Sequence, residues 1–367
     1  MLTSLPVLLY HYTGKKKDPI SVPPELFEAH LLAMTRAGYK GIGLDEATAY
    51  LLDGKPLPKK SVLITFDDGF LDNFLYAYPL LKEHGHKAVI FAAAGKIEER
   101  APRPTLADVR AGDVSETELP KLDSENNVDS LGYRERRDPF FSWDEARVME
   151  ESGVISVAAH TMFHESVFLG PDFEDFFCPG PRRRTFDRVA TPVVMGLPRF
   201  PKGPAMSNRA FLPSDEILTL AQSMVPQSLA EADAFFTDSK QVENLRRAME
   251  AIPSNRRGRM ETNTEYMERV RKELSDCKAL LEKELGGSRT AIAWPWGAYN
   301  EDVLQIAREV GFRLFFTTAV GSNPPARTAS HIHRFKAKAK PPGWLKSRLF
   351  IYSRPLLSKI YAVLRKL

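Results

Sequence analysis

The stretch Ser61-Val-Leu-Ile-Thr-Phe-Asp-Asp-Gly69 places two adjacent carboxylates, Asp67 and Asp68, directly after a run of apolar residues. The apolar run predicts a buried β-strand that opens into a loop at the two aspartates. Two like charges side by side repel each other, and desolvation adds to their cost, so a cation or a proton must offset one of them. A plain Asp-Asp-Gly turn is one interpretation. A metal ligand beside a general base is the other.

A second polar cluster, His160-Thr-Met-Phe-His164, follows the apolar residues 154–159. Two histidines four residues apart reach one point if the chain turns helically after the strand. Two imidazole nitrogens and one carboxylate oxygen make a three-ligand set that leaves positions open for water, as hydrolytic metal sites require. The spacing alone is a weak signal, because surface helices carry such pairs by chance.

Predicted strands and helices alternate along the chain. The strands cover residues 6–10, 62–66, 87–92, 154–159, 290–294 and 313–317, with a last one near 331–335, and the helices cover residues 24–34, 74–84, 143–152, 264–285 and 302–310. This alternation favours an α/β fold with parallel strands, in which active sites gather where the strands end. Asp67, Asp68 and His160 all follow strand ends, so both clusters are predicted to share one site.

Composition bounds the class of protein. The 367 residues include 43% hydrophobic and 27% charged residues, as in soluble globular proteins. Two segments, residues 98–139 and 166–260, interrupt the alternation, and the second includes short helical pieces such as residues 215–224. Both are expected to be long loop insertions that cap the site or select substrate, and a poorly ordered surface insertion is the alternative for the first. The two cysteines, Cys178 and Cys277, offer no disulfide framework and no CxxC metal site. Cys277 lies on an apolar helical stripe, which predicts a buried structural thiol.

Charge is distributed unevenly. Residues 310–367 contain twelve Lys and Arg and no Asp or Glu, whereas residues 1–309 contain 39 basic and 47 acidic residues. Within this part, residues 341–367 form two apolar and basic segments divided by Pro355. They predict an amphipathic helical tail lying in the plane of an anionic membrane surface, and a helix docked on the body is the alternative.

The sequence also indicates where in the cell the protein is expected and whether nucleic acid is a partner. The first residues lack the features of a secretory signal, and no apolar run is long enough to span a bilayer. We therefore expect a cytoplasmic protein that lies peripherally on the inner face of the cytoplasmic membrane. No nucleic-acid recognition motif accompanies the basic tail, so nucleic acid is not expected as a partner.

Three motifs, residues 65–69 (TFDDG), 160–164 (HTMFH) and 294–297 (WPWG), resemble in order the first three motifs of the NodB-homology polysaccharide deacetylases, carbohydrate esterase family 4. The residues of these motifs are most similar to those of the branch that deacetylates poly-β-1,6-N-acetylglucosamine. The resemblance covers residues 5–95, 140–165 and 262–336. It implies a deformed (β/α)7 TIM-like barrel as the catalytic domain, over residues 1–340, with residues 341–367 as the tail.

The resemblance also implies chemical roles. Asp67 resembles the general base that activates water, and Asp68, His160 and His164 resemble the metal ligands. Zinc suits this set, and nickel, cobalt, iron or manganese also fit it. The implied reaction is metal-dependent removal of an N-acetyl or N-formyl group from an amino sugar in a polysaccharide or lipid-linked glycan. A carbohydrate-binding member of the same fold without turnover is the alternative.

Pro295, Trp296 and Tyr299 belong to or follow the third motif. A strand-ending turn with buried aromatic rings is one interpretation, and a wall that binds the sugar ring by stacking is the one that the resemblance favours. Many family members carry an arginine before the proline of this motif, where it orients the base. Residues 291–294 contain no arginine.

The proton donor is less clearly marked. In the family it is normally a histidine of a late Leu-x-His motif, and residues 330–335 (SHIHRF) offer His331 and His333. We predict His333, although the same stretch also aligns with an Ile-x-Arg-Phe strand that carries no acid. His11, at the end of the first strand, is a further candidate for substrate binding or proton donation. His30, His84 and His86 are expected on the surface.

Overall fold

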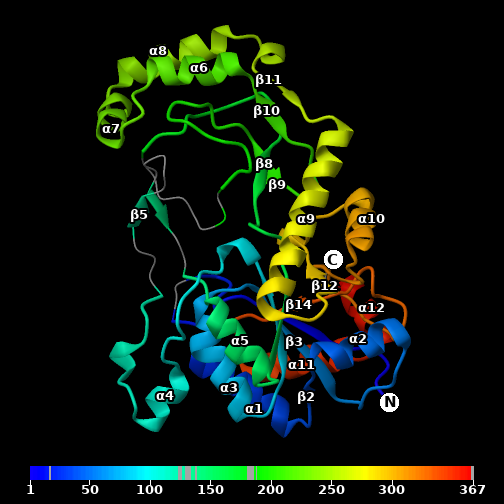
Figure 1. Ribbon diagram of the computed structural model, residues 1–367. Helices are drawn as coiled ribbons and strands as arrows, with labels where there is room; N and C mark the ends of the chain where they lie inside the picture. The colour runs from blue at the N-terminus through cyan, green and yellow to red at the C-terminus, as the bar shows by residue number, and fades with distance from the viewer. Residues whose placement is uncertain are drawn as a thin grey trace.

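The computed structural model describes residues 1–364, apart from residues 16–17, 123–125, 129–133, 137–138, 180–185 and 187, and only the backbone of residues 126–128 and 134–136. Figure 1 shows two parts: a curled sheet surrounded by helices, and a smaller subdomain that stands beyond one end of the sheet. The long helix that leads from the subdomain back to the sheet is α9 (Asn263–Leu285).

Within the described residues the main sheet has eight strands, each parallel to its neighbours. Along the sheet the order is β13 (Leu314–Phe316), β12 (Ala291–Ala293), β7 (Ile155–Ala159), β4 (Ala88–Ala92), β3 (Ser61–Asp68), β1 (Val7–Tyr10) and β14 (Phe335–Lys336), and β2 (Lys40–Gly41) pairs with the start of β3. A bridge between Phe316 and Ile332 brings the segment before β14 against β13. The sheet therefore curls back on itself, which confirms the deformed barrel.

The predicted helices cover the outer face of this sheet. They are α1 (Pro24–Arg36), a π-helical turn (Asn73–Ala77) that continues into α3 (Tyr78–Glu83), α5 (Trp143–Glu151), α9 and α10 (Glu301–Val310). Their starts follow from local sequence, because the side chains of Ser142, Thr262 and Asn300 each accept a hydrogen bond from a backbone N–H of the first turn. The stripe on α9 that includes Cys277 is buried, as predicted.

A helix that the sequence analysis does not predict, α2 (Leu44–Asp53), lies against the barrel interior. Its buried Ala47, Tyr50 and Leu51 pack in one cluster with interior side chains of the strands, among them Leu63 and Phe91. This cluster is separate from the larger core between the sheet and the outer helices. The interior is thus a filled core, and the polar residues gather at the strand ends.

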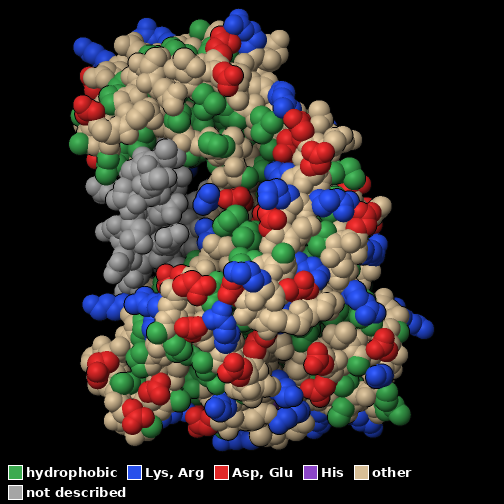
Figure 2. All heavy atoms as spheres, in the orientation of Figure 1, with side chains coloured by type: hydrophobic (Ala, Val, Ile, Leu, Met, Phe, Trp, Pro, Cys, Tyr) green, Lys and Arg blue, Asp and Glu red, His purple; other side chains and the backbone are tan. Residues whose placement is uncertain are grey.

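The second insertion is more than a loop. Its elements are β8 (Ser166–Phe168), β9 (Lys202–Pro204), β10 (Phe211–Pro213), α6 (Asp215–Met224), α7 (Leu229–Thr237), α8 (Ser239–Ala251) and β11 (Gly258–Met260). They enclose a hydrophobic cluster of their own, with Phe168, Phe176 and Leu245 among its buried members. Figure 2 shows the surface hollowed between this subdomain and the barrel. The insertion is therefore a small folded unit.

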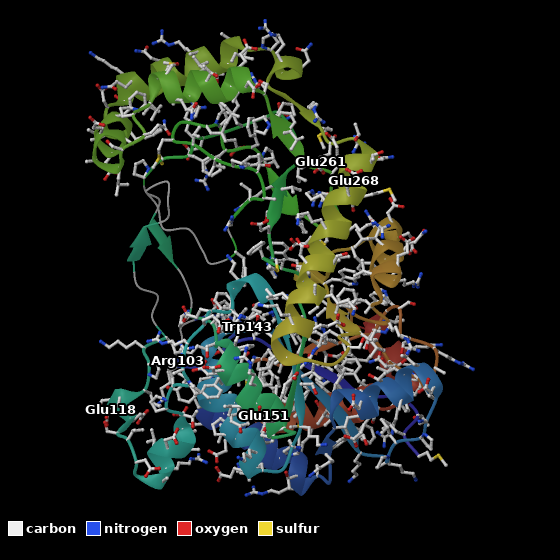
Figure 3. All side chains as sticks on the ribbon, viewed as in Figure 1. Arg103, Glu118, Trp143, Glu151, Glu261 and Glu268 are labelled. Carbon is white, nitrogen blue, oxygen red and sulfur yellow. The ribbon has the colours of Figure 1, made fainter. Side chains whose placement is uncertain are left out.

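The subdomain is joined to α9 by a partly buried charge network. Glu261, which Figure 3 places just before α9, receives hydrogen bonds from Arg269 at 2.8 and 3.0 Å. Arg269 also donates to the carbonyl oxygens of Ala205 and Asn208. The first insertion contains α4 (Leu106–Ala111) and a short β5–β6 pair (Asn126–Val128 and Arg134–Arg136), and its residues 123–125, 129–133 and 137–138 lie outside the described residues.

The C-terminal tail is helical, and its two helices differ in packing. In α11 (Pro342–Tyr352), Leu345, Leu349 and Tyr352 are buried in the main core, so this half is docked on the barrel. In α12 (Pro355–Leu364), Tyr361 packs against the main core, whereas Leu356, Ile360, Val363 and Leu364 are exposed. No helix among the described residues is both long and apolar enough to cross a bilayer.

Two of the three histidines predicted at the surface are buried, so that prediction is wrong for them. His30 lies between the hydroxyl group of Tyr10 and the carbonyl oxygen of Lys340. His86 accepts a hydrogen bond from the backbone N–H of Gly41. Both imidazoles connect neighbouring elements by hydrogen bonds, which offsets the cost of burying a polar ring.

Candidate active site

Asp67 and Asp68 form the end of β3, and the backbone brings both carboxylates to one side. Successive side chains of a strand point to opposite faces, so two neighbours in a regular strand would diverge. Asp68 has a φ of 80°, in the left-handed region that few residues other than glycine adopt. Asp68 Oδ1 thereby lies 3.3 Å from His160 Nε2. The strand end delivers a pair of carboxylates, as the sequence predicts.

His160 follows β7 directly, and His164 comes four residues later in a bend. The helical turn considered for this spacing is absent, since Thr161 and His164 have φ values of 62° and 55°. These left-handed residues fold the loop tightly enough to bring the two imidazole centroids within 5.0 Å. The carbonyl oxygen of Ala293 lies 2.8 Å from His160 Nδ1, which directs Nε2 of that ring toward Asp68.

Asp68, His160 and His164 offer three metal-ligand atoms within 4.8 Å of one another, and all three residues are buried. Asp68 Oδ1 lies 3.7 Å from His164 Nε2. Two imidazole nitrogens and one carboxylate oxygen suit zinc and the other first-row divalent ions, and they leave positions open for water. The donor set therefore fits a hydrolytic metal ion.

Two members of this set, Asp68 and His164, are held in the protonation states that a metal requires. Burial acts to raise the pKa of Asp68, but the hydrogen bond from His160 and the neighbouring imidazoles outweigh it and lower the pKa to about 2. Burial lowers the pKa of His164 to about 3. At neutral pH the carboxylate is therefore ionised and the His164 ring is neutral, as ligands must be. Burial acts to lower the pKa of His160, but the charges of Asp67 and Asp68 outweigh it and raise that pKa, so this ring would give up its proton when a metal binds.

A second group with suitable donor atoms, Glu28, Glu83 and His84, lies on α1 and at the end of α3. Arg110 already donates to both of these carboxylates. The negative charge is thus offset by a guanidinium, and this surface group has no need of a metal ion.

Arg334, to which the sequence analysis assigns no role, forms a buried ion pair with Asp67. Its guanidinium donates to both oxygens of Asp67, at 2.6 and 2.7 Å, and its Nε donates to the carbonyl oxygen of Thr317 at 2.8 Å. Both charged groups are buried. Burial acts to raise the pKa of Asp67, but the charge of Arg334 prevails and the pKa lies below its ordinary value. Asp67 is therefore a fixed, ionised carboxylate.

The position of Arg334 accounts for the arginine missing before the third motif. It comes from the segment that enters β14, on the same strand face as Ile332, whose side chain belongs to the interior core. The guanidinium also lies 5.5 Å from the centroid of the Phe91 ring. The Ile-x-Arg-Phe alignment of residues 332–335 is the sequence signal that could have identified this residue, although we used it only as an argument against a proton donor there.

His11 lies close to the carboxylates. β1 pairs with β3 in the register Tyr10 to Phe66, so His11, directly after β1, is level with Asp67 of β3 and on the same face. Burial lowers the pKa of His11, and the charges of Asp68 and Asp67 act in the opposite direction. Asn73 donates to the His11 carbonyl oxygen at 2.8 Å and holds the backbone there. The structure therefore groups His11 with the predicted site.

The third motif contributes one exposed ring. Trp296 has a φ of 54° and is 46% exposed, and its ring centroid lies 4.1 Å from that of His164. Pro295 is buried and therefore offers no surface to a sugar. Tyr299 stacks on the buried Trp294 at 5.4 Å and contacts His331 through its hydroxyl group. Of these residues, Trp296 alone presents an open aromatic face beside the ligand set.

His333 lies in different surroundings. Its neighbour Arg334 points toward Asp67, so the alternation of the strand turns His333 the other way. Its ring lies 4.9 Å from the ring of His331 and packs closely against Gly321, where an added Cβ would be 2.6 Å away. Among the described contacts, none joins His333 to the carboxylates. The structure does not bring this predicted proton donor to the cluster.

Comparisons with known proteins agree with this geometry. A family model described as polysaccharide deacetylase matches residues 54–176 and 254–315, just over half of the chain. The protein YxkH of Bacillus subtilis (strain 168), which is named as a polysaccharide deacetylase, is 44% identical over 87 residues, covering 24% of this chain and 31% of that protein. The poly-β-1,6-N-acetyl-D-glucosamine N-deacetylase of Escherichia coli (strain K12) is 22% identical over 285 residues, covering 77% of this chain and 29% of that protein.

Solved structures share the fold. The de-N-acetylase from Aggregatibacter actinomycetemcomitans superposes with a TM-score of 0.58 at 18% identity, over 94% of this chain and 99% of that chain. The BpsB deacetylase domain from Bordetella bronchiseptica gives 0.54 at 21% identity, over 91% and 96%. The chain spans less than a third of the length of the curated relatives that it matches.

Proposed function

Because this chain belongs to the polysaccharide deacetylase family, we propose that it is a metal-dependent hydrolase that removes N-acetyl groups from an amino sugar. The observation that carries the proposal is the division of the Asp67–Asp68 pair. Asp68 lies with two histidines as a ligand set, while Asp67 is held apart by Arg334. A buried carboxylate that is kept ionised and free of the ligand set is suited to accept a proton.

Asp68, His160 and His164 would hold the metal ion. When bound, a divalent metal supplies a Lewis acid that polarises the amide carbonyl and makes water a better nucleophile at neutral pH. We favour zinc, because two nitrogens and one oxygen are donors that zinc accepts readily, and nickel, cobalt, iron and manganese are the other candidates. An N-formyl group would fit the same chemistry.

The residues of the chain divide the proton transfers between them. Asp67 accepts a proton from the attacking water while Arg334 holds both carboxylate oxygens in place. As the amide C–N bond breaks, the leaving nitrogen needs a proton. We assign that donation to His11 in place of His333, because His11 shares the face of Asp67 across the β1–β3 pairing. Trp296 offers its exposed ring for stacking on the sugar.

The substrate is proposed to be an N-acetylated glycan, either a poly-N-acetylglucosamine chain or a lipid-linked amino sugar. The name of the Escherichia coli relative supports the polymer. The tail supports the lipid-linked form, because a protein held on a membrane meets lipid-linked sugars more often than finished polymer. A carbohydrate-binding protein without turnover is the second candidate, and the retention of Asp67 together with all three ligand residues speaks against it.

The direct test measures release of acetate and formate from lipid-linked and polymeric substrates, by mass spectrometry. Asp67→Asn should abolish release and leave the metal content near wild type. His160→Ala should lose the metal. Full activity of Asp67→Asn would refute the mechanism, and wild-type protein that carries metal but releases neither product from any substrate would favour the binding protein.

We further propose that α12 binds the anionic inner face of the cytoplasmic membrane. Leu356, Ile360 and Val363 follow helical spacing on one face and are 70, 49 and 63% exposed. The tail, residues 341–367, contains six Lys and Arg and no Asp or Glu, a charge that complements anionic lipid. Because α11 is part of the core, deleting residues 342–367 would damage the fold. Point changes in α12 are therefore the cleaner test.

The membrane proposal predicts that wild-type protein floats with phosphatidylglycerol vesicles and not with phosphatidylcholine vesicles. Leu356→Asn with Ile360→Asn should abolish flotation, whereas Met267→Asn, at an exposed apolar position of α9, should not. Unchanged flotation of the double variant would refute the role of α12. Loss of a concentration-dependent dimer in that variant, without vesicle binding by wild type, would assign the stripe to a second copy of the chain.

A further inference from the structure

The loop between the two histidine ligands is held in an unfavourable backbone conformation. Among the described residues, five other than glycine have a positive φ, and four of them lie at the site: Asp68, Thr161, His164 and Trp296. Thr161 and His164 bracket Met162 and Phe163. A left-handed conformation costs free energy in such residues, so it persists only where surrounding contacts impose it. The contacts of this loop therefore decide where the ligands lie.

The two imidazoles differ in what orients them. His160 Nδ1 has the carbonyl oxygen of Ala293 at 2.8 Å, the usual outer contact of a metal-binding histidine. His164 Nδ1 is buried and has no hydrogen-bond partner within the described part of the chain. The ring of His164 is flanked by Phe186 and Trp296, which confine it without fixing its direction by a hydrogen bond. The placement of His164 therefore depends on its backbone.

Glu273 of α9 holds that backbone. Its Oε1 accepts hydrogen bonds from the backbone N–H groups of Met162 and Phe163, at 2.9 and 3.2 Å. Successive N–H groups beside a left-handed residue form a concave anion site, which here is filled by a carboxylate of the protein itself. A carboxylate acceptor gives stronger hydrogen bonds than a neutral one. Glu273 thus stabilises the conformation that the loop would otherwise avoid.

The opposite edge of the loop is fixed by the segment after β4. Ala94 and Gly95 donate to the carbonyl oxygens of Thr161 and Met162, at 3.2 and 2.7 Å. Gly95 permits this approach, because a Cβ there would lie 2.3 Å from the Phe163 ring. The loop is therefore hydrogen-bonded on both edges: its carbonyl groups accept from the segment after β4, and its N–H groups donate to Glu273.

We propose that Glu273 is a positioning residue that sets the affinity of the site for its metal ion. The inference rests on the proposed function, since it takes His160 and His164 as ligands. It goes beyond that function by assigning part of the metal affinity to a helix that supplies no ligand. Loss of a residue that supports metal ligands typically weakens metal binding about 10- to 100-fold.

The variants separate charge, reach and hydrogen bonding. Glu273→Met removes the acceptor, and Glu273→Asp keeps the charge but shortens the side chain by one methylene group. Glu273→Gln keeps an acceptor oxygen at the same reach without the charge. Glu268→Met is the matched control, since Glu268 is an exposed carboxylate on the same helix, labelled in Figure 3.

Zinc dissociation constants, measured by competition with a chromogenic chelator, are the first readout. We expect Glu273→Met and Glu273→Asp to bind zinc about 10- to 100-fold more weakly than wild type, Glu273→Gln to lie between them and wild type, and Glu268→Met to match wild type. The visible absorption of the cobalt-loaded variants should change, because the ligand geometry changes. Wild-type zinc affinity and cobalt spectrum in folded Glu273→Met or Glu273→Asp would overturn the proposal.

Hydrogen exchange of the metal-free proteins is the second readout, and it does not depend on metal binding or turnover. The peptide that contains residues 160–164 should exchange faster in Glu273→Asp than in wild type and Glu268→Met. Equal exchange would overturn the proposal even if the protein binds no metal. Failure of wild type to bind metal, with faster exchange in Glu273→Asp, would instead reject the proposed metal-dependent function and retain the role of Glu273 in the loop.

Discussion

Replacing Arg334 with methionine should destabilise the protein strongly, because it leaves a buried carboxylate without its partner. The wild-type guanidinium gives Asp67 two hydrogen bonds, at 2.6 and 2.7 Å. The two side chains are 0 and 4% exposed, so solvent does not screen the pair. Removing one member of a buried ion pair typically costs about 3–5 kcal/mol, and we expect a loss of that size at neutral pH.

The loss should depend on pH in a defined direction. In wild type Arg334 outweighs burial and depresses the pKa of Asp67, so the stabilisation is complete above the unfolded pKa of about 4 and is lost as pH falls through the folded value. In the variant burial acts without that opposition, so the pKa of Asp67 rises. The folded variant then favours the protonated acid. Its deficit relative to wild type should therefore shrink as pH falls toward the raised pKa.

Urea unfolding of EDTA-treated protein at about pH 7.5 and about pH 5 measures this deficit without metal binding. The control is the double variant Asp67→Asn with Arg334→Met, which removes both charges and should recover much of the lost stability. A deficit below about 1 kcal/mol, or one that neither shrinks at acidic pH nor recovers in the double variant, would refute the reasoning.

Three shorter predictions follow from neighbouring contacts. His11→Ala should lower kcat about 100- to 10,000-fold with metal content unchanged, whereas His333→Ala should stay within about twofold, in steady-state assays of acetate release; equal losses would reassign the proton donor. Gly95→Ala should weaken zinc binding in chelator competition, because its Cβ would meet the Phe163 ring at 2.3 Å. Leu349→Ala, in the buried face of α11, should cost about 2–5 kcal/mol in urea unfolding, and Leu356→Ala, on the exposed face of α12, less than about 0.5 kcal/mol.

Local sequence was sufficient to predict most strands and helices of the barrel. Apolar runs of strand length, capping residues such as Ser142 and Thr262, and glycines after helices specify structure within a few neighbours, and the structure places strands and helices where these signals lie. The α2 helix was missed although its apolar spacing is readable at Ala47, Tyr50 and Leu51. In the second insertion the helix at residues 215–224 was predicted from local sequence, but the folded unit was not, because its core joins residues as far apart as Phe168 and Leu245.

The sequence by itself determined the two carboxylates at a strand end and the two histidines that follow another strand, because parallel strands bring their carboxyl ends to one face. It did not determine how those groups are divided or held. That depended on the buried pairing of Asp67 with Arg334, 267 positions away, and on Glu273 against the ligand loop. Charge pairing inside a protein depends on distance and burial, and only the folded chain brings residues so far apart in sequence to hydrogen-bond distance.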